Sequence, residues 1–254
     1  MSGFDTSDTL GRHSLAQLLA RHVAAAPDAA GATVAAAVSD WLRRWAGIPE
    51  ETVRTVEDWE HPASVLTCEE FLAPGELAAL RDFVLARERA FEAGTLVGPR
   101  HDGLYVDRSF RAADTLFDLG PFRDLFERRV TLYLPFVCAR LGIAPIERHW
   151  LEFQLTSMRD GGHFGRHDDN SHPANRTRRL TFVFYFYGSP TRPSGGELRF
   201  SPNGAWHGPL EVQPLPNRLV FFDSSVTHEV LPVRAESGRF EASRFTVNGW
   251  VHQE

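Results

Sequence analysis

The chain has 254 residues, of which 43% are hydrophobic and 24% charged, and its formal net charge is −6 at pH 7. These values are ordinary for a globular protein that can bury a sizeable core as one domain, with or without an appendage. The negative charge and the absence of a basic run give no electrostatic reason to expect a nucleic-acid partner. No apolar run approaches membrane-spanning length, so we expect no membrane partner either.

The cysteine content and the first residues suggest a cytoplasmic location. Cys68 and Cys138 form no CxxC pair, and we expect both as buried free thiols in separate helical segments. The polar start of the sequence, MSGFDTSDTLGRHS, has no signal-peptide pattern. A reducing cytoplasm suits free thiols.

The first part of the chain has helical patterns. Residues 14–26 and 30–45 are predicted helices separated by Pro27-Asp28, and we assign residues 1–62 to a helical N-terminal extension. This extension could cover a pocket, bind a partner or form the surface of a homodimer. Residues 63–254 would then form the main domain.

Two further helices are predicted before residue 146. The run Thr67-Cys68-Glu69-Glu70 has a capping-box pattern, and a helix is expected over residues 74–91. Another is expected over residues 121–141, ending at Gly142. Pro135 should kink this second helix.

The last part of the chain is rich in predicted strands. Short apolar or alternating runs separated by Gly, Pro and Asn clusters predict strands at 150–158, 180–187, 197–200, 210–213, 218–222, 228–233 and 240–251. Many short strands of this kind favour an α+β fold built on a double-stranded β-helix, the cupin-like jelly roll, with its core at about residues 147–254. The helices at 74–91 and 121–141 would cover one sheet.

Three side chains of this β-rich region could bind one metal ion. His167 and Asp169 are two residues apart, so an extended strand would direct both to the same side. His228 follows the predicted buried strand LVFF and the turn Asp223-Ser224-Ser225. Two imidazoles and one carboxylate can occupy one face of a ferrous ion and leave the opposite positions open.

Each of these features has a simpler explanation when taken alone. A His-x-Asp pair is more often a polar turn, and a single histidine is more often a hydrogen-bonded residue at a strand edge. The order of the three residues across a β-rich interval carries the hypothesis. Two other classes of protein stay open, namely a zinc enzyme that activates water with the same ligands and a jelly-roll binding module without catalytic activity.

The region from about Trp150 to Val251 resembles the iron(II)- and 2-oxoglutarate-dependent dioxygenases, in the prolyl-4-hydroxylase-like branch. The similarity lies in GGHFGRHDDNSH, RRLTFVFYFY, SGGELRF, NRLVFFDSSVTHEVLPV and SRFTVNGW. The resemblance implies that His167, Asp169 and His228 bind the iron and that Arg244 binds the outer carboxylate of 2-oxoglutarate. It also implies O2 as oxidant, with ascorbate as a candidate accessory reductant.

The resemblance further implies a hydroxylase. Related halogenases replace the carboxylate ligand with a small residue, so Asp169 favours hydroxylation. Members of the family act on protein or peptide side chains, free amino acids and small natural products, and we therefore expect a peptide or small-molecule substrate. The sequence does not choose among these classes.

The arginine that binds the co-substrate can also be argued from the residues alone. The chain has no lysine, and a guanidinium offers a planar fork for a carboxylate. We prefer Arg244 over Arg239, because Arg244 lies in a continuous strand pattern and Arg239 follows Ser237-Gly238 in a predicted loop. Thr246 lies on the same face as Arg244 by alternation and could donate a hydroxyl, although it is equally well explained as a strand former.

One position departs from the family pattern. Members of this branch often have a tyrosine nine residues before the first histidine ligand, and its phenol assists 2-oxoglutarate binding. Met158 occupies this position here and cannot donate such a hydrogen bond. Gln154, on the same predicted face, is a candidate replacement donor.

Overall fold

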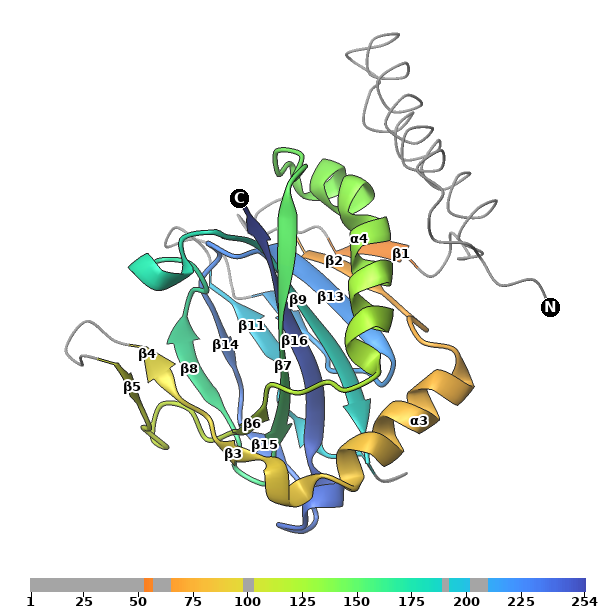
Figure 1. Cartoon of the computed structure of the whole chain (residues 1–254). Helices are drawn as coiled ribbons and strands as arrows, with labels where there is room; N and C mark the ends of the chain where they lie inside the picture. The colour runs from red at the N-terminus through yellow and green to blue at the C-terminus, as the bar shows by residue number, and fades with distance from the viewer. Residues whose placement is uncertain (1–52, 57–64, 98–102, 189–191, 202–209) are drawn as a thin grey trace, which may run out of the picture.

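Figure 1 shows the computed structural model, which describes residues 53–56, 65–97, 103–188, 192–201 and 210–254. The helices predicted at 14–26 and 30–45 lie outside these residues. The described part of the predicted extension is strand β1 (Val53–Val56), which pairs with β2 (Val65–Cys68). The boundary that we placed after residue 62 stays a prediction.

The fold is mixed α+β with several antiparallel sheets, consistent with the predicted jelly roll. The main sheet has eight strands in the order β1-β2-β13-β9-β16-β7-β6-β3. Beyond β1 and β2, its strands are β13 (Arg218–Asp223), β9 (Arg178–Tyr187), β16 (Arg244–Gln253), β7 (His149–Met158), β6 (Asp114–Leu116) and β3 (Glu92–Ala93). The long strands β7 and β9 flank β16, which therefore lies at the centre of the sheet.

A second sheet of four strands has the order β12-β11-β14-β8. Its members are β12 (Leu210–Val212), β11 (Leu198–Phe200), β14 (His228–Val230) and β8 (Phe164–His167). Two short pairs complete the sheets, β4 (Leu96–Val97) with β5 (Leu104–Tyr105) and β10 (Ser194–Gly195) with β15 (Val233–Arg234).

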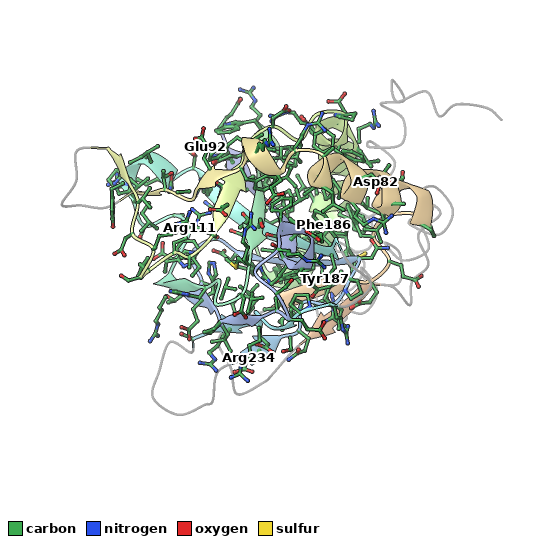
Figure 2. The ribbon with its side chains drawn as sticks, turned by 90° about the horizontal axis from the view of Figure 1, so that it is seen from below. Asp82, Glu92, Arg111, Phe186, Tyr187 and Arg234 are labelled. Atoms are coloured by element: carbon green, nitrogen blue, oxygen red, sulfur yellow. The ribbon has the colours of Figure 1, made fainter. Side chains whose placement is uncertain are left out.

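The main sheet separates two layers. Figure 1 shows helices α3 (Pro74–Leu85) and α4 (Phe122–Leu141) on one side of it, and β8, β11 and β14 on the other. In Figure 2, Asp82 of α3 and Arg234 of β15 mark these two sides, with Phe186 and Tyr187 of β9 between them. No helix in the described part of the chain has the length and apolar character that a membrane span requires.

Side-chain alternation along the central strands builds a different core on each face of the main sheet. On β9, Phe182, Phe184 and Phe186 are buried in the large core under the helices. Their neighbours Val183 and Tyr185 point to the second sheet and belong to a separate buried cluster. The apolar run LTFVFYFY of β9 therefore reflects burial on both faces.

Gly249 on β16 permits close packing of the central strands. A Cβ atom built there would lie 2.0 Å from Cζ of Phe182 on the neighbouring strand. A larger residue would push the Phe182 ring out of the core.

Two predictions about the helices were wrong in part. Helix α3 ends at Leu85 rather than Phe91, and a 3-10 turn follows at Glu88–Ala90. The capping-box prediction was also wrong, because Thr67 lies in β2. Ala73 precedes the helix, and its amide donates to the Glu76 carboxylate at 2.8 Å. Strand β2 is only four residues long, and two glutamates follow it directly. This local pattern resembles the start of a helix.

The predictions for the end of the second helix and for two free, buried cysteines are confirmed, but the helical placement of Cys68 was wrong. Helix α4 ends before Gly142, whose φ of 66° is left-handed as expected for a helix end, and Pro135 lies inside it. Both cysteines are free and buried as predicted. Cys138 lies in α4, but Cys68 lies on strand β2 and not in a helix.

Five of the seven predicted strands match observed strands to within two residues at each end, but the described chain has more strands than we predicted. The strand expected at 228–233 is two strands, His228–Val230 and Val233–Arg234, in different sheets. Residues 240–242 form a 3-10 turn, and the last strand begins at Arg244. The short strands β3, β4, β5, β6, β8 and β10 were not predicted, because two to four residues carry too little periodicity.

Candidate metal centre

The three predicted ligands come together at the edge of the second sheet. His167 is the last residue of β8 and His228 is the first residue of β14, and the two residues are direct partners in the antiparallel register. Asp169 lies two residues beyond the end of β8, in a bend, so it is not part of an extended strand as we had predicted. Its amide donates to the carbonyl of Ser224 in the turn before β14, which holds this bend beside the histidines.

The ligand atoms converge on one point. Nε2 of His167 lies 3.8 Å from Oδ1 of Asp169, and Nε2 of His228 lies 3.7 Å from Oδ2. The candidate ligand atoms of the three residues are all within 4.8 Å of one another. A single ion bound between them would contact all three side chains.

Both imidazoles have the tautomer that metal binding requires. Nδ1 of His167 is 2.7 Å from the carbonyl oxygen of Gly165, and Nδ1 of His228 is 2.8 Å from that of Val226. A carbonyl oxygen can only accept, so each Nδ1 donates and each Nε2 keeps its lone pair. Burial, with the neighbouring His228 ring, lowers the pKa of His167 to about 3, so His167 is neutral at pH 7.

A hydrogen bond from a neighbouring strand fixes the carboxylate ligand. Asp169 is buried, and its Oδ2 accepts a hydrogen bond of 2.7 Å from the hydroxyl of Thr181, which also lies 2.9 Å from the Ser224 hydroxyl. Burial alone would raise the pKa of Asp169, but His228, His167 and the Thr181 hydrogen bond lower it overall. The sequence did not identify Thr181, because a threonine in a strand is ordinary.

These three side chains fit a ferrous ion. Their two neutral nitrogens and one anionic oxygen are the mixed donor set of an open non-haem iron site, and no thiol is present to close the coordination sphere. The described residues contain no fourth His, Cys, Asp or Glu in this cluster. Positions opposite the three ligands are therefore available to a co-substrate.

A cavity of about 610 Å³ opens beside the triad between the two sheets. Strand β16 contributes Arg244, Thr246 and Asn248 to its lining, and β7 contributes Gln154 and Met158. The face sharing predicted for both strands is confirmed. The register pairs Arg244 with Met158, and Nη1 of Arg244 lies 3.5 Å from the methionine sulfur.

Arg244 is one of the most deeply buried large side chains, with 2% of its surface exposed. Its Nε has no hydrogen-bond partner, and no carboxylate in the described part of the chain pairs with it. The guanidinium carbon lies 4.8 Å above the Tyr185 ring, and a Cβ at Gly196 would lie 2.6 Å from its Cδ. A buried cation without an anion leaves a place for the carboxylate of a ligand.

Tyr185 is a candidate binding residue that the sequence did not reveal. Its side chain is fully buried beside Arg244, and its hydroxyl forms no well-aligned hydrogen bond with the described residues, although the Arg244 guanidinium is near enough to counteract part of the effect of burial on its pKa. Burial raises the pKa of this phenol to about 12, so it stays a donor at neutral pH. Tyr185 lies inside the apolar run of β9, so the sequence pattern indicated an ordinary core residue there.

The other predicted site residues are Thr246, Gln154 and the alternative arginine Arg239. Thr246 is buried, with 2% of its surface exposed, and lines the cavity. The Gln154 carbonyl oxygen accepts from Nη2 of Arg111 at 2.6 Å, so only its amide group could serve the co-substrate. Arg239 lies before a 3-10 turn and forms an ion pair with Glu241, with 74% of its side chain exposed, which removes it as a rival of Arg244.

The cavity lining also contains a paired cation, Arg178, that was not predicted. Arg178 donates to both carboxylate oxygens of Glu152, with a shortest distance of 2.7 Å, and lies 4.0 Å over the Trp250 ring. Nε2 of His252 donates to Oε2 of the same carboxylate at 3.1 Å. This cluster packs one edge of the site.

Comparison with known proteins agrees with this geometry. Residues 153–252 match the family model described as 2OG-Fe(II) oxygenase superfamily. This segment belongs to that superfamily. The oxygenase segment contains all three ligands and Arg244, and together with the triad it implies Fe(II) and 2-oxoglutarate.

A curated relative is the uncharacterized PKHD-type hydroxylase sll0191 of Synechocystis sp.. It is 34% identical over 137 residues, which cover 51% of this chain and 45% of the relative. The chain thus spans about half the length of the relative that it matches.

Two solved structures are similar to this chain in fold. A Pseudomonas putida prolyl-4-hydroxylase has a TM-score of 0.55 at 21% identity, over 87% of this chain and 99% of the other. A Trichoplax adhaerens prolyl hydroxylase, in complex with a hypoxia inducible factor peptide fragment, has a TM-score of 0.52 at 21% identity, over 74% of this chain and 83% of the other. At this identity the likeness concerns the fold alone.

Proposed function

We propose that this protein is an iron(II)- and 2-oxoglutarate-dependent dioxygenase that hydroxylates an unactivated C–H bond and releases succinate and CO2. The observation that carries the proposal is the convergence of His167, Asp169 and His228 within 4.8 Å, next to a cavity that contains the buried Arg244. Membership of the 153–252 segment in the oxygenase superfamily supports it.

The three ligands act by holding the metal in a fixed orientation. The carbonyl groups of Gly165 and Val226 fix the two imidazoles, and Thr181 fixes the carboxylate. When bound, the iron would activate O2, and 2-oxoglutarate and the substrate C–H bond would each supply two of the four electrons that reduce it. The chain supplies orientation and the exclusion of water from a buried site.

Arg244 would bind the outer carboxylate of 2-oxoglutarate through its unpaired guanidinium. Tyr185 would donate its phenol to the same carboxylate and so compensate for the methionine at position 158. Thr246 and the amide of Gln154 line the same cavity and are further candidate donors. Gly196 leaves the space that the Arg244 side chain occupies.

The substrate would be a peptide or protein side chain, an amino acid or a small natural product. The described prolyl hydroxylase complex contains a peptide, which supports peptides as one class to test. The cavity of about 610 Å³ is large enough for the co-substrate and one side chain or small metabolite.

The test is succinate formation by the full chain with Fe(II), 2-oxoglutarate and O2, against a panel of peptides and metabolites, with mass detection of one added oxygen. We expect triad-dependent succinate release, and loss of it in His167→Ala and Asp169→Ala. A zinc enzyme would form no succinate and would hydrolyse a substrate, whereas a binding module would do neither. Either result would refute the proposal.

A further inference from the structure

A second buried arginine, Arg111, lines the same cavity as Arg244. Only 9% of its surface is exposed, and its backbone forms a bridge with Phe164 of β8. Its guanidinium carbon lies 4.8 Å from the centre of the Phe164 ring, which in turn stacks on His167 at 3.7 Å. Figure 2 shows Arg111 at the end of the molecule that carries the β4–β5 pair.

The hydrogen bonds of Arg111 leave its charge without an anion. Nη1 donates to the carbonyl of Thr95 at 2.8 Å, and Nη2 donates to the Gln154 side chain at 2.6 Å. Both acceptors are neutral, and Nε has no partner. No carboxylate of the described residues forms an ion pair with Arg111, although a guanidinium has five N–H donors.

The acids around the cavity are already engaged. Glu152 pairs with Arg178, and Asp168 accepts the amides of Asn170 and Ser171 in the following turn. Asp169 favours the protonated form of Arg111 through space, but its oxygens face the metal position and Thr181.

Binding of the metal and 2-oxoglutarate would not supply an anion for Arg111. The proposed function assigns the Asp169 carboxylate and the keto-acid end of 2-oxoglutarate to the metal, and the outer carboxylate to Arg244. Burial lowers the pKa of Arg111 to about 10, so Arg111 stays charged at pH 7. In the filled site it is then a buried cation with no counter-ion, an arrangement that proteins avoid.

We propose that Arg111 binds a carboxylate of the substrate and so selects substrates that carry an acid group next to an apolar body. This inference rests on the proposed function and deepens it. A carboxylate matches the planar donors of one guanidinium, and its single charge balances that of Arg111, whereas a phosphate would add more negative charge than this one cation balances. The exposed apolar side chains that line the same cavity are suited to the apolar body: Val97, Leu104, Phe110 and Phe117.

The carboxylate could belong to a free acid or to an acidic residue of a peptide. The binding experiment therefore uses matched pairs, in which isovalerate, phenylacetate and N-acetyl-leucine are each compared with the corresponding amide. A further pair is a hydrophobic peptide with glutamate and the same peptide with glutamine. Binding is measured by calorimetry on the full chain with Mn(II) and 2-oxoglutarate under nitrogen, which requires no turnover.

We expect at least one acid to bind about tenfold or more tightly than its amide, since a buried charged hydrogen bond contributes that much. Arg111→Gln should remove this preference, and Arg111→Lys should keep part of it. The control is Arg108→Gln, because Arg108 lies in the same segment and bonds Ala113 and Asp114 at the surface. This variant should keep the preference. If only the free acids bind more tightly than their amides, the substrate is a free acid. If only the glutamate peptide binds more tightly than the glutamine peptide, the substrate is a peptide.

Three results would overturn the inference. In the first, no acid binds better than its amide, and in the second, Arg111→Gln keeps the preference in a protein whose circular dichroism and melting temperature are normal. In the third, Arg111→Gln weakens 2-oxoglutarate binding as much as Arg244→Gln does, which would assign Arg111 to the co-substrate. Failure of the proposed function would give a different result. The protein would then release no succinate in a triad-dependent way, while Arg111 would still bind acids more tightly than amides.

Discussion

His167 and His228 face each other as direct partners on antiparallel strands, with ring centroids 4.3 Å apart and both Nε2 atoms directed at Asp169. This single strand pair joins residues 61 positions apart in the chain. The site therefore depends on the pairing of β8 with β14, and on the hydrogen bonds that fix each ligand.

Replacing Thr181 should weaken metal binding without changing the ligands. Thr181→Val removes the 2.7 Å hydrogen bond to Asp169 and keeps the shape of the side chain. We expect about a tenfold loss of Mn(II) affinity, as is typical for a residue that orients a metal ligand. Thr181→Ser keeps the hydroxyl and should bind nearly as well as the wild type. Equal Mn(II) affinities in Thr181→Val and wild type, measured by calorimetry, would show that the hydrogen bond has no such role.

Arg244 should control the affinity for 2-oxoglutarate. Arg244→Gln removes the buried charge that would bind the outer carboxylate, so the KM for 2-oxoglutarate should rise by about tenfold or more. Arg239→Gln is the matched control, because that arginine is exposed and paired with Glu241, and its KM should stay within about twofold of wild type. Similar KM values for the two variants would contradict the assignment.

Tyr185 allows binding and folding to be separated. Its hydroxyl is buried without a well-aligned hydrogen bond, so Tyr185→Phe should leave the melting temperature unchanged or raise it slightly. The same change should weaken 2-oxoglutarate binding by about threefold to tenfold, since a donor next to Arg244 is lost. Thermal denaturation and titration with 2-oxoglutarate measure the two effects. Unchanged 2-oxoglutarate affinity would remove Tyr185 from the co-substrate site.

The fold was predictable where the sequence pattern is long. Strands β7 and β9 and helix α4 have ten or more residues, and their periodicity or apolar runs identified them. Strand β2 has four buried residues followed by two glutamates, and the local pattern alone resembled a helix cap. Its strand state comes from pairing with β13, a partner about 150 residues away that no local window contains.

The candidate site was predictable to a similar degree. The triad and Arg244 have charged or imidazole side chains in a recognisable order, so the sequence indicated them. Thr181 and Tyr185 lie inside a run that also reads as core, and only the pairing of β9 with β16 brings Tyr185 to Arg244. Arg111 lies outside the β-rich region, and nothing in its neighbours indicates that it is buried beside Phe164.

The ion pair between Glu152 and Arg178 in the cavity lining should make stability depend on pH. Burial raises the pKa of Glu152, but His252 and Arg178 lower it overall below its ordinary value of 4.5. A carboxyl group with a lowered pKa in the folded state stabilises the protein above the unfolded value, and this stabilisation is lost as the pH falls below about 4.5.

Glu152→Gln should therefore lower the free energy of unfolding by about 1 to 2 kcal/mol at pH 7 and flatten its decline below pH 4.5. The control Glu211→Gln breaks the more exposed pair with Arg199 and should have a smaller effect. Urea denaturation between pH 2.5 and 7 gives both values. A decline below pH 4.5 as steep in Glu152→Gln as in wild type would contradict this account.

The central claim is that His167, Asp169 and His228 together bind one divalent metal ion. The most direct measurement is an anaerobic titration of the full chain with Mn(II), followed by electron paramagnetic resonance, for the wild type and for Asp169→Ala and His228→Ala. We predict one tight site per chain in the wild type and its loss in both variants, which should keep the wild-type circular dichroism spectrum. A stoichiometric site that persists in either folded variant would contradict the claim.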